Sequence, residues 1–467
     1  MDYELILKDI KPTEEEQNQI DDMSSRLVNF LKDACKNENI DAKINIVGSV
    51  AKHTALKGKS DIDIFMAFPL SVSVDDLKKN GLNLAHKCND AFGGVAAHHF
   101  ASHPYVTSEI DGFEVDFVPC YDIEDGSQLK SAVDRTILHT RYVKANLTEE
   151  GCDEVLLLKK FMDVTGTYGS EFKVGGFAGY LCELLIIKYG SFEETLKQAS
   201  QWKFGHVIDL EDYGTSQLFN DPLIVIDPTD KNRNVGAALR LNKLSEFIQS
   251  ARNYINSNNK KDYFYPLEKQ LNKDEILNEF KNRGSDLIVI KFDIPEIPLD
   301  TLHPQLKMTT ESLVEKINDR EFKVFQADYS SNEVDSAVML IEMASSKLND
   351  VIVNFGPKVF LDLACNNFTK KYGSENCYII DDFLVHKQNR QFSDVFKFIE
   401  YVFTPEHIGL IKVGKNLRKT IIKSYEFITI DELAGYDEYL QFLDDFLNPG
   451  QYIVRWYLLI FWKFKKL

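Results

Sequence analysis

We expect this chain to be an α+β protein of several domains. Its 467 residues exceed what one hydrophobic core normally serves, which indicates two to four domains. Segments with strand-like alternation dominate 1–141, helical spacing dominates 142–258, and both kinds interleave in 259–467. The predicted domains are therefore 1–141, 142–258 and 259–467, the last with α/β character.

The chain begins with a predicted helix over about 13–34. Thr13 and Glu16 have the spacing of a capping box directly after Pro12. Apolar residues then recur with helical spacing and predict one buried stripe, formed by Ile20, Met23, Leu27, Phe30 and Leu31. A strand is predicted over 43–47, where apolar and polar residues alternate.

Gly48 and Ser49 come directly after this strand and precede a short segment, ending near residue 56, that has helical character. Backbone N–H groups and the helix dipole attract phosphate at such a junction. The Ser49 hydroxyl adds a donor and the Lys52 ammonium adds a positive charge. A Gly-Ser pair alone is ordinarily only a turn, so the junction predicts a phosphate site only in combination with metal-binding carboxylates.

Carboxylates on two predicted strands form the candidate catalytic site. Alternation over 62–68 places Asp61 and Asp63 on one face, about 6.6 Å apart along the strand. Residues 113–118 alternate similarly and supply Asp116 from a second strand that can pair with the first. An Asp-x-Asp strand is more often a solvated face, but three carboxylates after a glycine turn predict two-metal phosphoryl transfer.

The remaining elements are predicted from apolar spacing. In 142–258 we predict three helices: one around 156–162, one from 175–176 to about 189, and one that starts past Asp230 and carries Arg233 and Val235 toward Leu241. In 259–467 we predict strands over 287–292, 323–327 and 338–342, and helices over 310–317, 393–402 and 416–425.

The ordered motifs resemble the nucleotidyltransferase superfamily that includes DNA polymerase beta, and more closely the archaeal CCA-adding enzymes, the class I tRNA nucleotidyltransferases. The matching runs are GSVAKHTALKG at 48–58, SDIDIF at 60–65, HPYV at 103–106, VDFVPCY at 115–121, SAVDRT at 131–136, FKVGGFAGYLCELL at 172–185, DPTD at 227–230, RNV at 233–235 and GKN at 414–416. This resemblance implies a polymerase-beta-like palm, a helical central nucleotide-binding domain that roofs the site, and a C-terminal tRNA-binding region.

The resemblance also implies roles for individual residues. Asp61, Asp63 and Asp116 correspond to the family's catalytic, metal-binding carboxylates, which hold two Mg²⁺ ions; many relatives have Glu at the first position. The residues implied to bind the substrates CTP and ATP are Gly48, Ser49, Lys52, His139, Lys159, Tyr168 and Arg233, with Arg233 helping to select the base. The family commonly has Arg at the position of Lys52, so bidentate phosphate binding is lost there. His103 and Thr136 match motif residues around the pocket.

Each contact residue also has an ordinary structural interpretation. A lysine on a helix is usually solvated, a tyrosine usually packs its ring in a core, and a histidine often serves a backbone carbonyl. The pair His98 and His99 is not a metal site, because adjacent strand residues point to opposite faces.

The formal net charge of −18 is unusual for a protein that binds RNA. One stretch, 411–424, is basic without any acidic residue, and Lys415, Asn416, Arg418 and Lys419 within it are the candidate tRNA contacts. A basic run is also often only a solvated helix face.

Seven scattered cysteines without a Cys-x-x-Cys pair favour a reducing, cytoplasmic setting. The longest apolar run, 456–462, is far shorter than the ~20 residues of a membrane span and predicts a terminal element docked on a core. The N-terminus predicts no signal peptide. We expect tRNA and nucleotides as partners and no membrane, and the sequence is compatible with a homodimer.

Three alternatives share part of this pattern. A poly(A) polymerase or oligoadenylate synthetase would share the carboxylates and add only adenylate. A small-molecule nucleotidyltransferase would not need the residues after the central domain. A catalytically silent RNA-binding protein is disfavoured because Asp61, Asp63 and Asp116 are all present.

Overall fold

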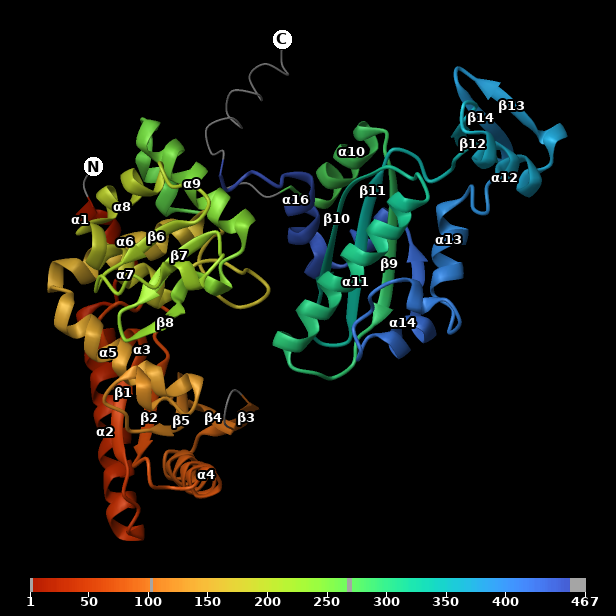
Figure 1. Cartoon of the computed structure of the whole chain (residues 1–467). Helices are drawn as coiled ribbons and strands as arrows, with labels where there is room; N and C mark the ends of the chain where they lie inside the picture. The colour runs from red at the N-terminus through yellow and green to blue at the C-terminus, as the bar shows by residue number, and fades with distance from the viewer. Residues whose placement is uncertain (1–2, 101–103, 267–270, 454–467) are drawn as a thin grey trace. The chain divides into compact units, whose positions relative to one another are not determined.

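The computed structural model describes residues 3–100, 104–266 and 271–453, without the side chains of 98–100 (Figure 1). The chain divides into two compact units. The first consists of Met1–Leu267 together with Gly450–Leu467, and the second of Glu268–Pro449. His103 and the apolar run 456–462 lie outside the described residues.

A five-stranded mixed sheet forms the N-terminal part of the first unit. Its strands lie in the order β1 (Lys43–Val47), β2 (Ile62–Phe68), β5 (Phe113–Tyr121), β4 (Pro104–Ile110) and β3 (Val95–Phe100). The two strands predicted to carry the carboxylates, β2 and β5, are neighbours and run parallel, whereas the other pairs are antiparallel. The predicted pairing of these two strands is confirmed.

The long helix α2 (Glu14–Glu38) and the helix α4 (Val74–Ala91) share a hydrophobic core with this sheet. The predicted capping box is present, because the Thr13 side chain accepts from the Glu16 N–H and the Glu16 carboxylate accepts from the Thr13 N–H. The helix continues past the predicted end at 34 and stops at Asn39, whose left-handed conformation (φ 54°) terminates it.

Strand β2 is buried on both faces beyond Asp63. Ile62 and Ile64 belong to the core shared with α2 and α4, whereas Phe65 packs on the opposite face in a cluster that includes Ile137 of α5 (Arg135–Asn146). Asp63 therefore lies where an otherwise buried strand remains accessible.

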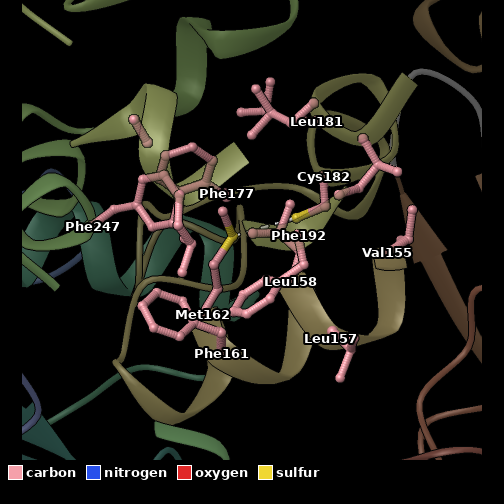
Figure 2. Close-up of a cluster of buried hydrophobic side chains, with 14 of the residues drawn as sticks. Val155, Leu157, Leu158, Phe161, Met162, Phe177, Leu181, Cys182, Phe192 and Phe247 are labelled. Atoms are coloured by element: carbon pink, nitrogen blue, oxygen red, sulfur yellow. Dashed lines mark hydrogen bonds between the residues drawn. The ribbon is translucent and has the colours of Figure 1, made fainter. Parts of the chain in front are cut away.

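Five helices pack into the second part of this unit: α1 (Tyr3–Ile10), α6 (Glu149–Val164), α7 (Gly179–Tyr189), α8 (Phe192–Ala199) and α9 (Leu241–Asn256). Figure 2 shows their shared core, in which Phe161 and Met162 of α6 lie near Phe177 and Phe247. Helix α1, which the sequence did not predict, contributes two buried isoleucines to this core. The two helices predicted around 156–162 and up to 189 are confirmed.

The third helix predicted in this region is wrong at its start. A three-stranded sheet is present instead, with β6 (His206–Asp209), β7 (Leu223–Asp227) and β8 (Asp230–Asn234), and Arg233 lies on β8. The Asp227 and Asp230 carboxylates accept from backbone N–H groups two residues on, and the Asn234 side chain accepts from the Val225 N–H of the neighbouring strand. These local bonds compete with a helix, so the helix begins only at Leu241.

The second unit contains an antiparallel sheet in the order β10 (Val324–Ser331), β11 (Ser336–Met343), β9 (Asp286–Asp293) and β15 (Glu426–Ile428). Its helices are α10 (Lys273–Arg283), α11 (Leu299–Asp319), α13 (Val395–Val402), α14 (Arg418–Ser424), α15 (Ile430–Leu433) and α16 (Leu440–Leu447). A smaller sheet, β12 (Val351–Lys358), β14 (Phe383–Asn389) and β13 (Cys377–Ile380), accompanies α12 (Asp362–Tyr372). The predicted strands and helices are all found, with the helix at 310–317 extended to Leu299–Asp319.

None of the helices in the described part of the chain has the length and apolar character that crossing a membrane requires.

Candidate active site

Two of the predicted carboxylates face one another across neighbouring strands. Asp63 on β2 is the register partner of Asp116 on the parallel strand β5. The Thr107 hydroxyl of β4 donates to Oδ1 of Asp116 at 2.5 Å and so restricts its orientation. Asp61 precedes β2 and is exposed.

The glycine turn lies directly against Asp63. Gly48 has φ +69°, and a Cβ added there would lie 1.8 Å from Oδ2 of Asp63. Glycine is therefore required both for the left-handed backbone and for the close approach of the carboxylate. The helical turn α3 (Gly48–Ala51) starts here without a side-chain cap, which leaves its first N–H groups available beside the carboxylates.

The electrostatics of this pair favour a bound cation. Burial raises the pKa of Asp63 to about 7, and the charges of Asp116, Asp61 and Glu114 add to this effect while Lys52 opposes it. Like-charged oxygen ligands of this kind fit a hard divalent ion, which would relieve their repulsion. In the part of the chain that the structure describes, no three His, Cys, Asp or Glu side chains are already grouped closely enough to hold an ion. The charge of Asp61, which is exposed, acts on Asp63.

The two predicted phosphate lysines meet at a buried glutamate. Lys52 Nζ lies 2.6 Å from Glu183 Oε2, and Lys159 Nζ lies 3.8 Å from Glu183 Oε1. Lys159 also donates to the Thr54 carbonyl at 2.8 Å, and the Thr54 hydroxyl donates to Glu183 at 2.7 Å. The Lys52, Lys159 and Glu183 side chains are all at most 8% exposed, so neither lysine is the solvated side chain of the ordinary interpretation.

Tyr168 and Lys159 converge at the N-terminus of α7. A Cβ added to Gly179, the first residue of this helix, would lie 3.3 Å from the Tyr168 hydroxyl and 3.4 Å from Lys159 Nζ. The residue before the helix is Ala178, which provides no side-chain cap. Uncapped N–H groups, an ammonium and a phenol hydroxyl in one place form a favourable setting for phosphate.

His139 and Arg233 meet at a second buried carboxylate, that of Asp227. The Nε2 atom of His139 lies 2.9 Å from Asp227 Oδ2, and NH1 of Arg233 donates to the same oxygen at 2.8 Å. The sequence predicts Arg233 on a helix, and the structure instead brings it to this carboxylate from strand β8. Burial lowers the pKa of His139, although Asp227 opposes this shift.

Tyr180 of α7 joins these groups. Its ring stacks on His139 with the centroids 3.9 Å apart, and Lys52 Nζ lies 5.9 Å from the Tyr180 centroid. The charge of Lys52 also acts on both Asp63 and His139. Lys52 therefore lies between the predicted carboxylates and the predicted nucleotide contacts of the first unit.

Sequence reasoning missed three members of this site, Glu183, Tyr180 and Asp227. Glu183 is a lone acidic residue in the apolar helix α7, a pattern that signals a buried and paired carboxylate. Asp227 begins the run DPTD, which the sequence marks only as a point of resemblance.

Three family models match successive parts of the chain: a nucleotidyltransferase domain over 27–139, a tRNA nucleotidyltransferase second domain over 153–265, and a CCA-adding enzyme C-terminal domain over 283–429. The CCA-adding enzyme of Methanothermobacter thermautotrophicus is 44% identical over 457 residues, which cover 97% of this chain and 99% of that enzyme. The chain belongs to the archaeal-type CCA-adding enzyme family.

Other members of the CCA-adding enzyme family match over similar lengths. That of Methanosarcina acetivorans is 35% identical, covering 92% of this chain and 94% of the relative. That of Thermoplasma acidophilum is 33% identical, covering 89% of this chain and 92% of the relative. Among solved structures, one of Cid1, described as having RNA terminal uridylyl transferase activity, covers 57% of this chain with a TM-score of 0.45 and 14% identity.

The part matched by the CCA-adding enzyme C-terminal domain carries the basic run. Three side chains of α11 fix its loop: Ser312 accepts from the Lys412 N–H, Thr309 from the Gly414 N–H and Gln305 from the Asn416 N–H. The run's charged side chains are exposed, and in the described part of the chain none of them forms an ion pair; they are Lys412, Lys415, Arg418, Lys419 and Lys423. The loop backbone before α14 is thus held by α11, and this loop and α14 together carry the exposed basic side chains.

Proposed function

We propose that this protein adds C, C and A stepwise to the 3′ end of tRNA from CTP and ATP, with release of pyrophosphate. The observation that carries this proposal is the in-register pair Asp63 and Asp116, with the glycine turn against it and Lys52 nearby. Membership of the CCA-adding enzyme family supports the choice of product.

In this proposal Asp61, Asp63 and Asp116 hold two Mg²⁺ ions. When bound, the ions would activate the 3′-hydroxyl for in-line attack on the α-phosphate and neutralise the departing pyrophosphate. Asp116 accepts the proton of the hydroxyl, and the hydrogen bond from Thr107 keeps one of its oxygens oriented during this transfer.

The triphosphate binds between the turn and the start of α7. Ser49 and the free N–H groups of α3 contact it from one side, and Tyr168, Lys159 and the N-terminus of α7 from the other. Lys52 exchanges its hydrogen bond to Glu183 for a phosphate oxygen. Together these groups stabilise the charge that develops on pyrophosphate.

The nucleoside lies against His139 and Arg233. In the family that the chain resembles, the arginine selects the base together with the backbone of the bound RNA. A guanidinium supplies several donors in a rigid plane, which suits this task.

The tRNA binds to the basic run of the second unit through Lys415 and Asn416 of the loop and Arg418 and Lys419 of α14. The loop backbone is hydrogen-bonded to α11, and the basic side chains of 411–424 form no ion pair in the described chain, so their charges are available for phosphates. We retain the three predicted domains, 1–141, 142–258 and 259–467, as catalytic, nucleotide-binding and tRNA-binding parts. Seven free thiols fit action in a reducing cytoplasm.

Incorporation of labelled CTP and ATP into tRNA lacking its last three nucleotides tests the proposal. With magnesium, the wild-type protein should add C, C and A and then stop, and Asp116→Ala should abolish the addition. Tailing with adenylate alone would assign the protein to the poly(A) polymerase alternative. Absence of incorporation would favour a silent RNA-binding protein.

A further inference from the structure

Asp227, the last residue of β7, accepts five hydrogen bonds in the interior of the protein. Its Oδ1 accepts from the Thr229 N–H at 2.9 Å, the Thr229 hydroxyl at 2.8 Å and the Tyr180 hydroxyl at 3.3 Å. Its Oδ2 accepts from His139 at 2.9 Å and Arg233 at 2.8 Å. The side chain is 0% exposed, so protein groups replace its hydration.

The carboxylate stays ionised in this setting. Burial opposes ionisation, but hydrogen bonds from His139, Thr229 and Arg233 outweigh it and hold the pKa of Asp227 well below its ordinary value. A carboxylate only accepts hydrogen bonds, so Nε2 of His139 carries a proton and its orientation is set. Stacking on Tyr180 fixes the plane of the same ring.

Arg233 is held at one end only. Its NH1 atom is bound to Asp227, whereas 34% of its side chain is exposed and, in the described part of the chain, no other side chain pairs with it. The bond to Asp227 therefore holds the guanidinium plane in place, and its remaining N–H donors are available to a ligand.

We propose that Asp227 is a positioning residue for nucleotide selection, which holds the His139 ring and the Arg233 guanidinium in one fixed relation so that the site discriminates between the cytosine and adenine bases. The inference rests on the proposed function. A site that chooses between bases by hydrogen bonds requires donors with fixed positions. A loosely held arginine could shift to form hydrogen bonds with either base and would not discriminate between them.

The variant Asp227→Asn tests this role. The amide keeps the size of the side chain, but it carries no negative charge and has only one accepting oxygen. It can therefore no longer accept from both the His139 and Arg233 donors on one side and the Thr229 donors on the other. The measurement is the ratio of kcat/KM for CTP to that for ATP at the first addition, on tRNA that lacks its last three nucleotides. We expect the ratio to fall by about 10- to 100-fold, as for loss of hydrogen bonds to a charged group.

Asp230→Asn is the matched control. Asp230 lies three residues away, at the start of β8, and its carboxylate pairs with Arg135 at 3.1 Å instead of with His139 or Arg233. We expect its ratio to match that of the wild type. Both nucleotides are measured on the same preparation, so a smaller folded fraction cancels from the ratio. If Asp227→Asn does not fold, Asp227→Glu, which keeps the charge but displaces it by one methylene, should lower the ratio in the same direction.

An unchanged ratio in Asp227→Asn, or an equal fall in Asp230→Asn, would overturn the inference. If the wild type adds C, C and A but the variant selects as well as the wild type, only the positioning role fails. If the wild type does not add C, C and A, the proposed function itself fails.

Discussion

Single buried carboxylates organise the cations of this site. Glu183 is 1% exposed and serves Lys52, Lys159 and Thr54 together. An ion pair taken out of water is stable only when its partners remain matched. Loss of the Glu183 charge would leave two ammonium groups in the interior without their common counter-ion.

We predict that Glu183→Gln destabilises the protein by about 3–5 kcal/mol, the effect of removing one partner from a buried ion pair. Urea-induced unfolding, followed by circular dichroism, measures the change. Glu246→Gln is the control, since Glu246 pairs with Lys243 one turn away on α9, where both side chains are partly exposed. The control variant should lose at most about 0.5 kcal/mol of unfolding free energy. A comparable loss of stability in both variants would show that the burial of Glu183 does not determine how much its substitution destabilises the protein.

Among the elements, the junction of β1, the glycine turn and β2 determines where the carboxylates lie. Val47 is the register partner of Asp63, so the turn at Gly48 folds back onto this carboxylate. The parallel pairing of β2 and β5 then brings Asp116 opposite. The position of Asp63 thus depends on Gly48, because any side chain at this turn would collide with the carboxylate.

We predict that Gly48→Ala lowers the rate of CMP incorporation by at least about 100-fold, because an added Cβ 1.8 Å from Asp63 displaces the carboxylate or the turn. Single-turnover incorporation into a tRNA minihelix measures this rate. Gly58→Ala is a matched control, with φ +73° but no atom within 4 Å of the added Cβ. It should retain a rate within a few-fold of the wild type. Equal losses in both would attribute the effect to backbone strain instead of the close approach.

For the whole molecule, the distribution of charge matters more than its sum. The net charge of −18 repels RNA at long range. The basic run 411–424 opposes this with exposed cations on α14 and on the loop before it, whose backbone is hydrogen-bonded to α11. Affinity for tRNA should therefore depend on few residues and strongly on salt.

We predict that the triple variant Lys415→Ala, Arg418→Ala, Lys419→Ala binds tRNA more weakly and with a salt dependence less steep by about one unit of log K per log salt for each lost phosphate contact. Filter binding across a salt series measures the slope. Lys273→Ala with Lys281→Ala removes exposed charges from α10 of the same unit and should leave the slope unchanged. A triple variant with the wild-type slope would place the tRNA elsewhere.

Much of the fold was predictable because its signals are local. The capping box of α2, the alternation in β2 and β5, and the apolar residues of α6 and α7 lie within or next to the element that they predict. Helix α1 was missed because it forms by packing on a core whose other residues lie far along the chain. The small sheet around β7 was misassigned because local side-chain bonds of Asp227, Asp230 and Asn234 compete with a helix there. For the same reason Arg233, which was predicted on a helix, lies on strand β8.

The candidate site divides in the same way. Asp61, Asp63, Asp116 and the turn at Gly48 could be found from the sequence because their order and spacing are themselves the signal. Glu183 could not be assigned a partner, since Lys52 and Thr54 lie about 130 residues earlier. Asp227 likewise meets His139 from 88 residues away.

The sequence by itself therefore determined the family and pointed to the candidate carboxylates and the glycine turn beside them, because residues close together in the chain carry these features. Only the tertiary structure decided which buried anions hold the cations. Glu183 and Asp227 acquire their roles because folding removes water from them, and a buried charge must then find its partners wherever the chain brings them.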